Sequence, residues 1–228
     1  MPILVIDHGS SDRTREIARE RGAEVIDRPF EGFVAARRFA LTQVRTQWTL
    51  MIDADEALDD VLRDSIAGAR DDVNGYFVLR TTFYRGRALR MWRDEPLLRL
   101  FRTKDVRIES FPSAGGSAQL HERCTCEPPL GTLAGSLLHY SYPTHAAYSA
   151  KYDFYTSIEA RGLQPSRARA AQELAGAIPR FFWYLFARGA LADGISGARI
   201  AWHSALYPAM VRMKALHPST GSGQAPKW

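Results

Sequence analysis

The hydrophobic and polar positions of the first 60 residues predict strands and helices in alternation. Three short apolar runs, at residues 3–6, 23–26 and 48–52, have the length and composition of buried strands. The segments between them, residues 14–21 and 32–47, are rich in helix formers. A strand-helix-strand-helix-strand order predicts parallel pairing with right-handed crossovers, as in a nucleotide-binding α/β sheet.

The middle of the chain continues with both kinds of element. Residues 57–69 are predicted to form a third helix, and residues 75–80 a further strand. Between residues 83 and 101, large apolar and basic residues alternate without helical periodicity, which indicates β-rich structure. Another apolar strand is expected at residues 133–139, and it ends in His139.

From residue 145 onward the pattern becomes helical. Helical segments are predicted at residues 146–162, 166–177 and 179–216, of which the last is long and aromatic. Its interruptions are Gly189, Gly194, Gly197 and Pro208. The apolar run at residues 181–187 is bounded by arginines and falls far short of the ~20 residues needed to cross a bilayer.

The length and composition fit a globular protein with one main domain. The chain has 228 residues, of which 46% are hydrophobic, enough for a sizeable core. We expect a sheet-bearing domain at residues 1–144, a helical extension at residues 145–216 and a disordered tail at residues 217–228. The two cysteines, Cys124 and Cys126, support neither a disulfide framework nor a structural zinc site.

The net charge of +5 is unevenly distributed. Residues 1–144 hold 20 Lys and Arg against 21 Asp and Glu, whereas residues 145–228 hold 10 against 4. The basic surplus therefore lies among the aromatic residues of the last third, a combination that favours contact with an anionic membrane surface. Nucleic-acid binding is disfavoured because no helix-turn-helix, zinc or RNA-recognition signature accompanies the charge. No signal-peptide pattern is visible at the N-terminus, so a cytoplasmic location is expected.

The segment from Trp48 to Glu56 carries the strongest chemical signal. Its apolar run ends in Asp53 and Asp55, two carboxylates one residue apart at the carboxyl end of a strand. Oxygen ligands at such an edge suit Mg²⁺ or Mn²⁺ bridged to the phosphates of a nucleotide. The alternative is a strand followed by an acidic helix start, with Asp55 or Glu56 as the cap.

Two other segments place polar groups after predicted strands. The loop from Asp7 to Asp12 is rich in capping residues, and Ser11 or Asp12 can cap the helix that follows. Further along, a glycine loop precedes the pair His121 and Glu122. The alternative for Glu122 is an ion pair with Arg99 or Arg123, and for His139 a buried, hydrogen-bonded histidine.

Taken together, these motifs resemble family 2 glycosyltransferases of the GT-A fold. The loop from Asp7 through Thr14 resembles the V-D-x-G-S-x-D-x-T loop of that family, and Asp53-Ala-Asp55 resembles its later D-x-D. More narrowly, further segments look like those of bacterial lipopolysaccharide-core glycosyltransferases: Gly32-Phe-x-x-x-Arg37, Trp48, Arg99-Leu-Phe-Arg102, His121-Glu122 and His139-Tyr-Ser-Tyr142. The resemblance implies an α/β fold with a Rossmann-like, mostly parallel sheet flanked by helices, and a C-terminal helical extension.

The resemblance also implies roles for individual residues. Asp7 would contact the base or ribose of a nucleotide sugar, and Asp12 would hold the loop or the nucleotide. Asp53 would lie near the ribose and metal, while Asp55 would ligate Mg²⁺ or Mn²⁺ with the diphosphate. Glu122 matches the position of the family's general base.

Three more positions follow from the same resemblance. His139 matches a histidine that completes the metal or diphosphate site. Gly115 and Gly116 match the glycine-rich loop that approaches the donor sugar. The implied reaction moves a sugar from a nucleotide sugar to a hydroxyl of a cell-envelope glycan such as lipopolysaccharide core, with inversion, at the inner face of the bacterial inner membrane.

One feature departs from the family pattern. Family members begin with a strand and an Asn-Glu loop before the V-D-x-G-S strand, whereas Met1 here lies directly before that strand. Either the true start lies upstream of Met1 or the chain is a truncated copy, and in the second case we expect loss of the first strand to expose sheet edges and to remove part of the base pocket. The alternative function is therefore a catalytically inactive, truncated paralogue that binds a membrane or a partner.

Overall fold

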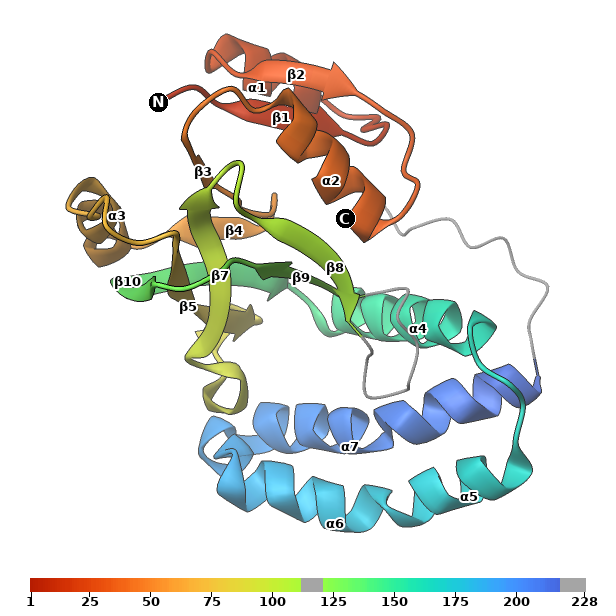
Figure 1. Cartoon of the computed structure of the whole chain (residues 1–228). Helices are drawn as coiled ribbons and strands as arrows, with labels where there is room; N and C mark the ends of the chain where they lie inside the picture. Colours follow the sequence, from red (N-terminus) through yellow and green to blue (C-terminus); the bar gives the residue numbers. More distant parts are fainter. Residues whose placement is uncertain (112–120, 218–228) are drawn as a thin grey trace.

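The computed structural model of the protein describes residues 1–111 and 121–217, and its largest layer is a mixed sheet of six strands (Figure 1). The strands follow the order β3-β7-β5-β10-β4, with β6 beside β5. They are β3 (Trp48–Leu50), β7 (Glu95–Arg102), β5 (Gly75–Tyr84), β10 (Leu130–Tyr142), β4 (Glu56–Leu58) and β6 (Arg87–Ala88). Only β5 and β10 pair in parallel within this sheet, and the other pairs are antiparallel.

The first two strands form a separate parallel sheet. In it, β1 (Leu4–Asp7) pairs with β2 (Glu24–Asp27), and α1 (Thr14–Glu20) connects the two. The helix α2 (Phe33–Gln43) then leads to β3, which pairs with β7 and not with β1. Parallel pairing is thus confirmed for the first two strands and wrong for the third. The α/β class with flanking helices is confirmed, while the sheet is mixed and not mostly parallel.

A third small sheet contacts the large one through the strand β7. It consists of β8 (Arg107–Phe111) and β9 (His121–Thr125) in antiparallel register, with Ser110 opposite Glu122. The α2 helix is tied to β8 because the Arg38 guanidinium donates two hydrogen bonds, of 3.0 and 2.7 Å, to the carbonyl of Ile108. This packing places α2 against both β8 and β9.

The segment after Asp55 differs from its prediction. Residues Glu56 to Leu58 form β4, which pairs with β10, and α3 (Asp60–Ala67) begins only after it. The helix is capped by Asp59, whose Oδ1 accepts a 2.7 Å hydrogen bond from the Leu62 amide. Neither Asp55 nor Glu56 is therefore the helix cap. The strand β10 likewise continues to Tyr142, so that His139 lies within it and not at its end.

The C-terminal region is helical, as predicted. It contains α4 (His145–Arg161), α5 (Arg167–Ala175), α6 (Ala177–Phe182), the π-helical turn η2 (Trp183–Ala187), the 3₁₀ turn η3 (Ala190–Asp193) and α7 (Gly194–Leu216). Gly189 and Gly194 interrupt the last segment, and both have positive φ. Gly197 and Pro208 do not interrupt it, because both lie inside α7.

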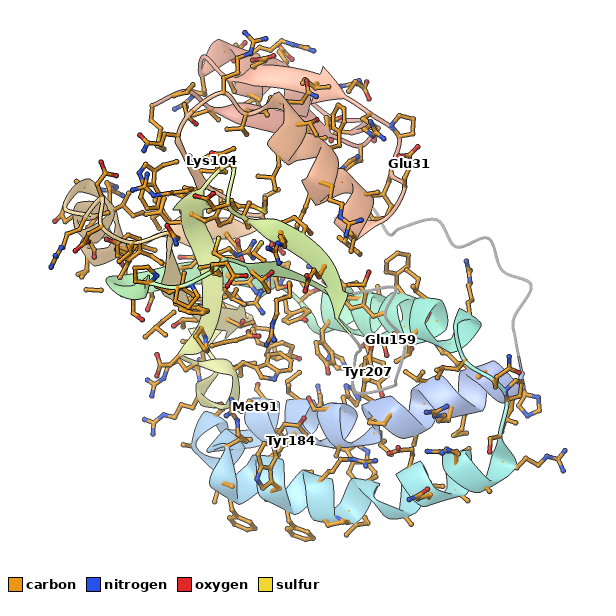
Figure 2. All side chains as sticks on the ribbon, in the orientation of Figure 1. Glu31, Met91, Lys104, Glu159, Tyr184 and Tyr207 are labelled. Carbon is orange, nitrogen blue, oxygen red and sulfur yellow. The ribbon has the colours of Figure 1, made fainter. Side chains whose placement is uncertain are left out.

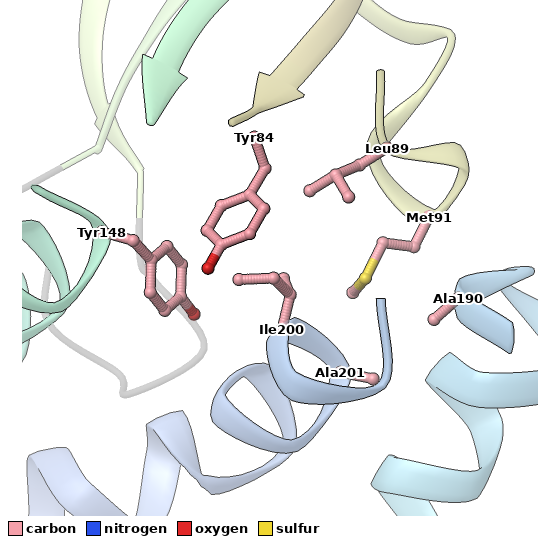
Figure 3. Close-up of a cluster of buried hydrophobic side chains, with 7 residues drawn as sticks. All are labelled: Tyr84, Leu89, Met91, Tyr148, Ala190, Ile200 and Ala201. Atoms are coloured by element: carbon pink, nitrogen blue, oxygen red, sulfur yellow. The ribbon is translucent and has the colours of Figure 1, made fainter. Parts of the chain in front are cut away.

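A shared hydrophobic core joins the helices to the sheet. Figure 3 shows Tyr84 at the end of β5, Met91 in the 3₁₀ turn η1 (Arg90–Trp92), Tyr148 of α4 and Ile200 of α7 around one buried cluster. A second cluster fills the space between the sheet and α3, and a third joins α4 to α7. The domain boundary at residue 144 stays a prediction. Among the described residues, no helix is both long and apolar enough to cross a membrane.

Candidate functional site

The carboxylate of Asp53 lies between two arginines at the edge of the large sheet. Asp53 follows β3 in the turn that leads to β4. Nη2 of Arg37, from α2, lies 2.8 Å from its Oδ1, and Nη2 of Arg99, from β7, lies 2.9 Å from its Oδ2. Burial raises the pKa of Asp53, but Arg99 and Arg37 lower it by more, so that this pKa is below its ordinary value.

Arg37 also connects Asp53 to Glu122. Its Nε lies 2.6 Å from Oε1 of Glu122, and both side chains are largely buried. One guanidinium therefore spans two carboxylates that are distant in sequence, one beside β3 and one on β9. Because the planar guanidinium carries several N–H donors and a permanent charge, it can contact both carboxylates at once. Glu122 is thus in an ion pair, and its partner is Arg37.

The buried Glu56 supports the turn that presents Asp53. Its Oε2 accepts a 2.8 Å hydrogen bond from the Asp53 amide, and its Oε1 lies 3.0 Å from Nη2 of Arg99. Arg80 approaches the same Oε1 at 3.7 Å. Arg99 therefore contacts Glu56 and Asp53 at once, which fixes both the turn and the orientation of the Asp53 carboxylate.

Asp55 faces a different set of partners. Its Oδ2 lies 3.3 Å from Nε2 of His139 on β10 and 3.1 Å from Nζ of Lys151 on α4. Lys151 also donates a 2.8 Å hydrogen bond to Oγ of Ser141. Burial raises the pKa of Asp55, but the contacts with His139 and Lys151 lower it by more, and the carboxylate is ionised at neutral pH.

His139 is oriented by the strand next to its own. Its Nδ1 lies 3.3 Å from Oγ1 of Thr82 on β5, so that Nε2 is directed at Asp55. The backbone of Asp55 is held to β10 as well, because the Tyr140 amide donates a 2.8 Å hydrogen bond to its carbonyl. The pair of Asp55 and His139 is therefore built into the sheet.

The side chains of Asp55 and His139 could together bind a divalent ion that takes its other ligands from the substrate and from water. A carboxylate and an imidazole lie within 3.3 Å, and both are suitable ligands for Mn²⁺. Within residues 1–111 and 121–217, no group of three or more His, Cys, Asp or Glu side chains could hold a metal. Mg²⁺ is commonly bound through one or two carboxylates plus substrate phosphates and water. Lys151 shares Oδ2 of Asp55, so an ion would bind Oδ1 or displace the ammonium.

The two predicted residues near the N-terminus lie in the loop after β1. Asp7 is buried, and its Oδ2 accepts 2.9 Å hydrogen bonds from the amides of Gly9 and Ser10. Burial raises the pKa of Asp7, but the hydrogen bonds from Ser10 and Gly9 outweigh this and lower it overall. Asp12 is exposed and accepts a 3.0 Å hydrogen bond from the Thr14 amide at the start of α1. Within the described chain, no hydrogen bond or ion pair joins either residue to Asp53 or Asp55.

Several residues of the site carried no predicted role. Arg37 and Arg99 belong to segments that resemble glycosyltransferase motifs, but their contacts with Asp53 depend on how α2 and β7 pack. Lys151 lies in a helix of otherwise ordinary composition, and no signal in the sequence distinguishes it from other lysines. The predicted loop residues Gly115 and Gly116 lie outside the described residues.

Comparison with known proteins shows what this chain is similar to. The family model described as Glycosyl transferase family 2 matches residues 2–123. An uncharacterized glycosyltransferase of Rickettsia bellii is 30% identical over 217 residues, which are 86% of this chain and 70% of that protein. An uncharacterized glycosyltransferase of Rickettsia typhi is 30% identical over 71% of this chain, which spans only 58% of that relative's length. The lipopolysaccharide core biosynthesis glycosyltransferase LpsC of Rhizobium meliloti is 27% identical over 93% of this chain and 81% of its own length.

Proposed function

The chain belongs to glycosyltransferase family 2, and from that premise we propose that it transfers a sugar from a nucleotide-sugar donor to a hydroxyl of a cell-envelope glycan. The observation that carries the proposal is the convergence of Asp53 and Glu122 on Arg37, beside Asp55 with its two partners. Lipopolysaccharide core is the acceptor class that we favour, because LpsC is named for that pathway.

The donor side of the proposal concerns Asp55, His139 and Lys151. Mg²⁺ or Mn²⁺, when bound by Asp55 and His139, would neutralise charge on the departing diphosphate. Lys151 supplies a second positive charge at the same carboxylate and would attract the diphosphate as a point charge. Asp7, Asp12, Gly115 and Gly116 are proposed to contact the nucleotide or the sugar, from the family resemblance alone.

The acceptor side of the proposal concerns Glu122. A sugar hydroxyl is a poor nucleophile until a carboxylate accepts its proton during attack. In the proposed displacement, the acceptor oxygen bonds to the anomeric carbon as the bond from that carbon to the diphosphate breaks, and the proton passes to Glu122. Arg37 holds the Glu122 carboxylate in a fixed orientation before the reaction, through the 2.6 Å contact with Oε1. A single step of this kind inverts the anomeric carbon.

The experiment begins with donor binding. A panel of nucleotide sugars with Mn²⁺ is screened for thermal stabilisation, since a ligand at 100 times its Kd stabilises a protein by about 2.7 kcal/mol. Donor hydrolysis and transfer are then measured for Asp55→Ala and in the presence of a chelator, and we expect both to abolish turnover. The matched control is Asp64→Ala, because Asp64 is exposed on α3 and away from the site. Full turnover of Asp55→Ala in chelator would exclude the metal assignment.

Glu122 is tested by a separate variant. Glu122→Gln should retain donor binding while transfer falls at least a hundredfold, within the range of general-base effects of about 10²–10⁴. Glu109→Gln on the neighbouring strand β8 is the control, since Glu109 is exposed. Unchanged transfer in Glu122→Gln would remove this residue as the base. Absence of any donor binding in the panel would favour the inactive paralogue.

We also propose that the helical region contacts an anionic membrane at the inner face of the bacterial inner membrane. Leu174, Ile178, Phe182 and Phe186 are spaced by four residues along α5, α6 and η2, and each is at least half exposed. An exposed apolar row within a basic segment combines insertion of side chains with attraction to anionic headgroups. Tyr207, one of the aromatic residues of the basic last third of the chain, instead points inward and donates a hydrogen bond to Glu159.

Membrane contact is tested by co-sedimentation with vesicles. Binding to phosphatidylglycerol vesicles should exceed binding to phosphatidylcholine vesicles, because the latter carry no net charge. The double variant Phe182→Ser and Phe186→Ser should lose most of that binding. Val61→Ser on α3 is the control, since Val61 is also more than half exposed but lies in another part of the fold. Equal binding of the wild type and the double variant would exclude this surface.

A further inference from the structure

A cavity of about 390 Å³ opens directly beside His139 and Thr82. It lies between the strands β5 and β10 on one side and the turn η2 on the other, where Met91 and Tyr184 approach each other in Figure 2. Its size is within the range of about 300–1,000 Å³ that small-molecule sites occupy. The cavity therefore extends from the Asp55 partner His139 toward the C-terminal helices.

The wall of this cavity is largely aromatic. Trp92, Tyr142 and Tyr184 line it, and the same three residues also line an adjoining cavity of about 190 Å³ that reaches in among the tyrosines of α4. Flat aromatic rings offer apolar contact area at low entropic cost, and tyrosine adds a hydroxyl for hydrogen bonding. Such a wall suits a sugar ring, which has apolar C–H faces and polar edges.

Two arginines line the cavity, Arg80 and Arg188, and they differ in whether a carboxylate neutralises their charge. Arg80 is neutralised by Glu95, whose Oε2 lies 2.6 Å from its Nη2. Arg188, at the end of η2, donates a 2.9 Å hydrogen bond to the uncharged carbonyl of Met91, and its guanidinium lies 5.8 Å from the Trp183 ring centre. No carboxylate of residues 1–111 or 121–217 lies within ion-pair distance of Arg188.

Arg188 is thus held in place at the cavity while its charge stays uncompensated. A guanidinium fixed through one nitrogen keeps other N–H donors for a ligand. Its planar arrangement matches the geometry of a carboxylate or a phosphate, which it can bind through two parallel hydrogen bonds. A neutral sugar alone would leave this charge without a partner.

We infer that this cavity receives the acceptor, and that the acceptor is a sugar with an anionic substituent, a phosphate or a carboxylate, bound by Arg188. The inference rests on the proposed function, since the cavity begins at His139, the residue that the proposed function places beside the donor diphosphate. The sugar ring packs on the aromatic wall, and the anionic group reaches Arg188. Arg188 is therefore the residue that selects charged over neutral acceptors.

The test measures binding without any donor. Tryptophan fluorescence of the full chain is titrated with glucose, glucose 6-phosphate and glucuronate, because Trp92 and Trp183 both line the cavity. We expect glucose 6-phosphate or glucuronate to bind at least tenfold more tightly than glucose, and the stronger of the two identifies the anionic group. Inorganic phosphate is titrated alone, and it should bind more weakly than glucose 6-phosphate because it lacks the ring.

Arg188→Gln should abolish the preference for the charged sugars while the weak binding of glucose is unchanged. Arg188→Lys should keep part of the preference, since it retains the charge but not the paired donors. Arg199→Gln is the control, because Arg199 is exposed on α7 and outside the cavity. Circular dichroism of each variant confirms that it is folded.

The outcomes separate this inference from the proposed function. Equal binding of charged and neutral sugars to the wild type, or an unchanged preference in Arg188→Gln, overturns the inference even if the protein transfers sugar. An Arg188-dependent preference supports the binding site even if every nucleotide sugar fails as a donor, in which case the proposed function is the part that fails.

Discussion

The ammonium of Lys151 lies 3.1 Å from the carboxylate of Asp55, although the two residues are 96 positions apart. Asp55 lies at the edge of the sheet and Lys151 in α4, the first helix of the C-terminal region. The side chain of Lys151 is buried, and Ser141 is its second polar partner. The helical region therefore contributes a charge to the candidate site as well as packing against the sheet.

Removal of this charge should affect both stability and activity. In Lys151→Met, Asp55 keeps His139 but loses a buried cation, and we expect the free energy of unfolding to fall by about 1–3 kcal/mol. This range is below the 3–5 kcal/mol typical of a fully buried pair because the Asp55 side chain is 35% exposed. Transfer should fall at least tenfold. Urea unfolding and transfer assays measure the two effects, with Lys104→Met, at an exposed position, as the control (Figure 2).

Acid should destabilise the protein through Asp55. The pKa of Asp55 in the folded protein lies below its ordinary value of 3.8, despite burial, because of His139 and Lys151. When the pKa of a carboxyl group is lower in the folded protein than in the unfolded chain, the ionised group stabilises the fold at pH values above the unfolded pKa. This stabilisation is lost as the pH falls through the folded pKa and the group becomes protonated. We therefore expect the free energy of unfolding to decrease below about pH 4. The decrease in the free energy of unfolding should be smaller in Asp55→Asn than in Asp64→Asn, as measured by urea unfolding at several pH values. An equal dependence of the unfolding free energy on pH in the two variants would contradict the prediction.

The hydroxyl of Tyr207 should stabilise the packing of α4 against α7. It donates a 2.7 Å hydrogen bond to Oε1 of the fully buried Glu159 (Figure 2). Tyr207→Phe keeps the ring but removes a donor from a buried carboxylate, which costs about 1–3 kcal/mol. Thermal unfolding measures the effect, and Tyr140→Phe, at a half-exposed position on β10, should unfold like the wild type. A Tyr207→Phe protein as stable as the wild type would show that the bond contributes nothing.

Gly197 should not tolerate a side chain, although it lies inside a helix. A Cβ at this position would come within 2.0 Å of the Ala190 carbonyl oxygen and 2.6 Å of Cβ of Asp193. Alanine would gain about 1 kcal/mol of helix propensity. The clash with backbone outweighs this gain, because overpacking typically costs about 1–3 kcal/mol. We expect Gly197→Ala to lower the melting temperature, whereas Gly68→Ala, with no neighbouring atom closer than 3.9 Å, should not.

The kinds of element were predictable because they depend on local patterns. The apolar run before Asp53 predicted β3, and the helix formers after residue 145 predicted α4 to α7. The errors lie where a distant partner decides the local structure. Glu56 and the two residues after it form a strand because β10 lies beside them, and the paired residues of β10 are 79 to 83 positions away in the sequence. Pro208 stays inside α7 for a similar reason, because the helix is buried against α4.

The candidate site shows the same division. The sequence alone places Asp53 and Asp55 after a strand, His139 at the end of another and Glu122 after a glycine loop, and their order resembles a glycosyltransferase. Only the tertiary structure decided which cations each carboxylate meets. Asp53 meets Arg37 and Arg99, Glu122 meets Arg37, and Asp55 meets Lys151. Hydrophobic periodicity specifies which face of an element is buried, but the pairing of charges needs two elements to be packed at a defined distance. An ion pair acts over only a few ångströms, so it follows from the packing of the core and cannot be derived from the spacing of residues along the chain.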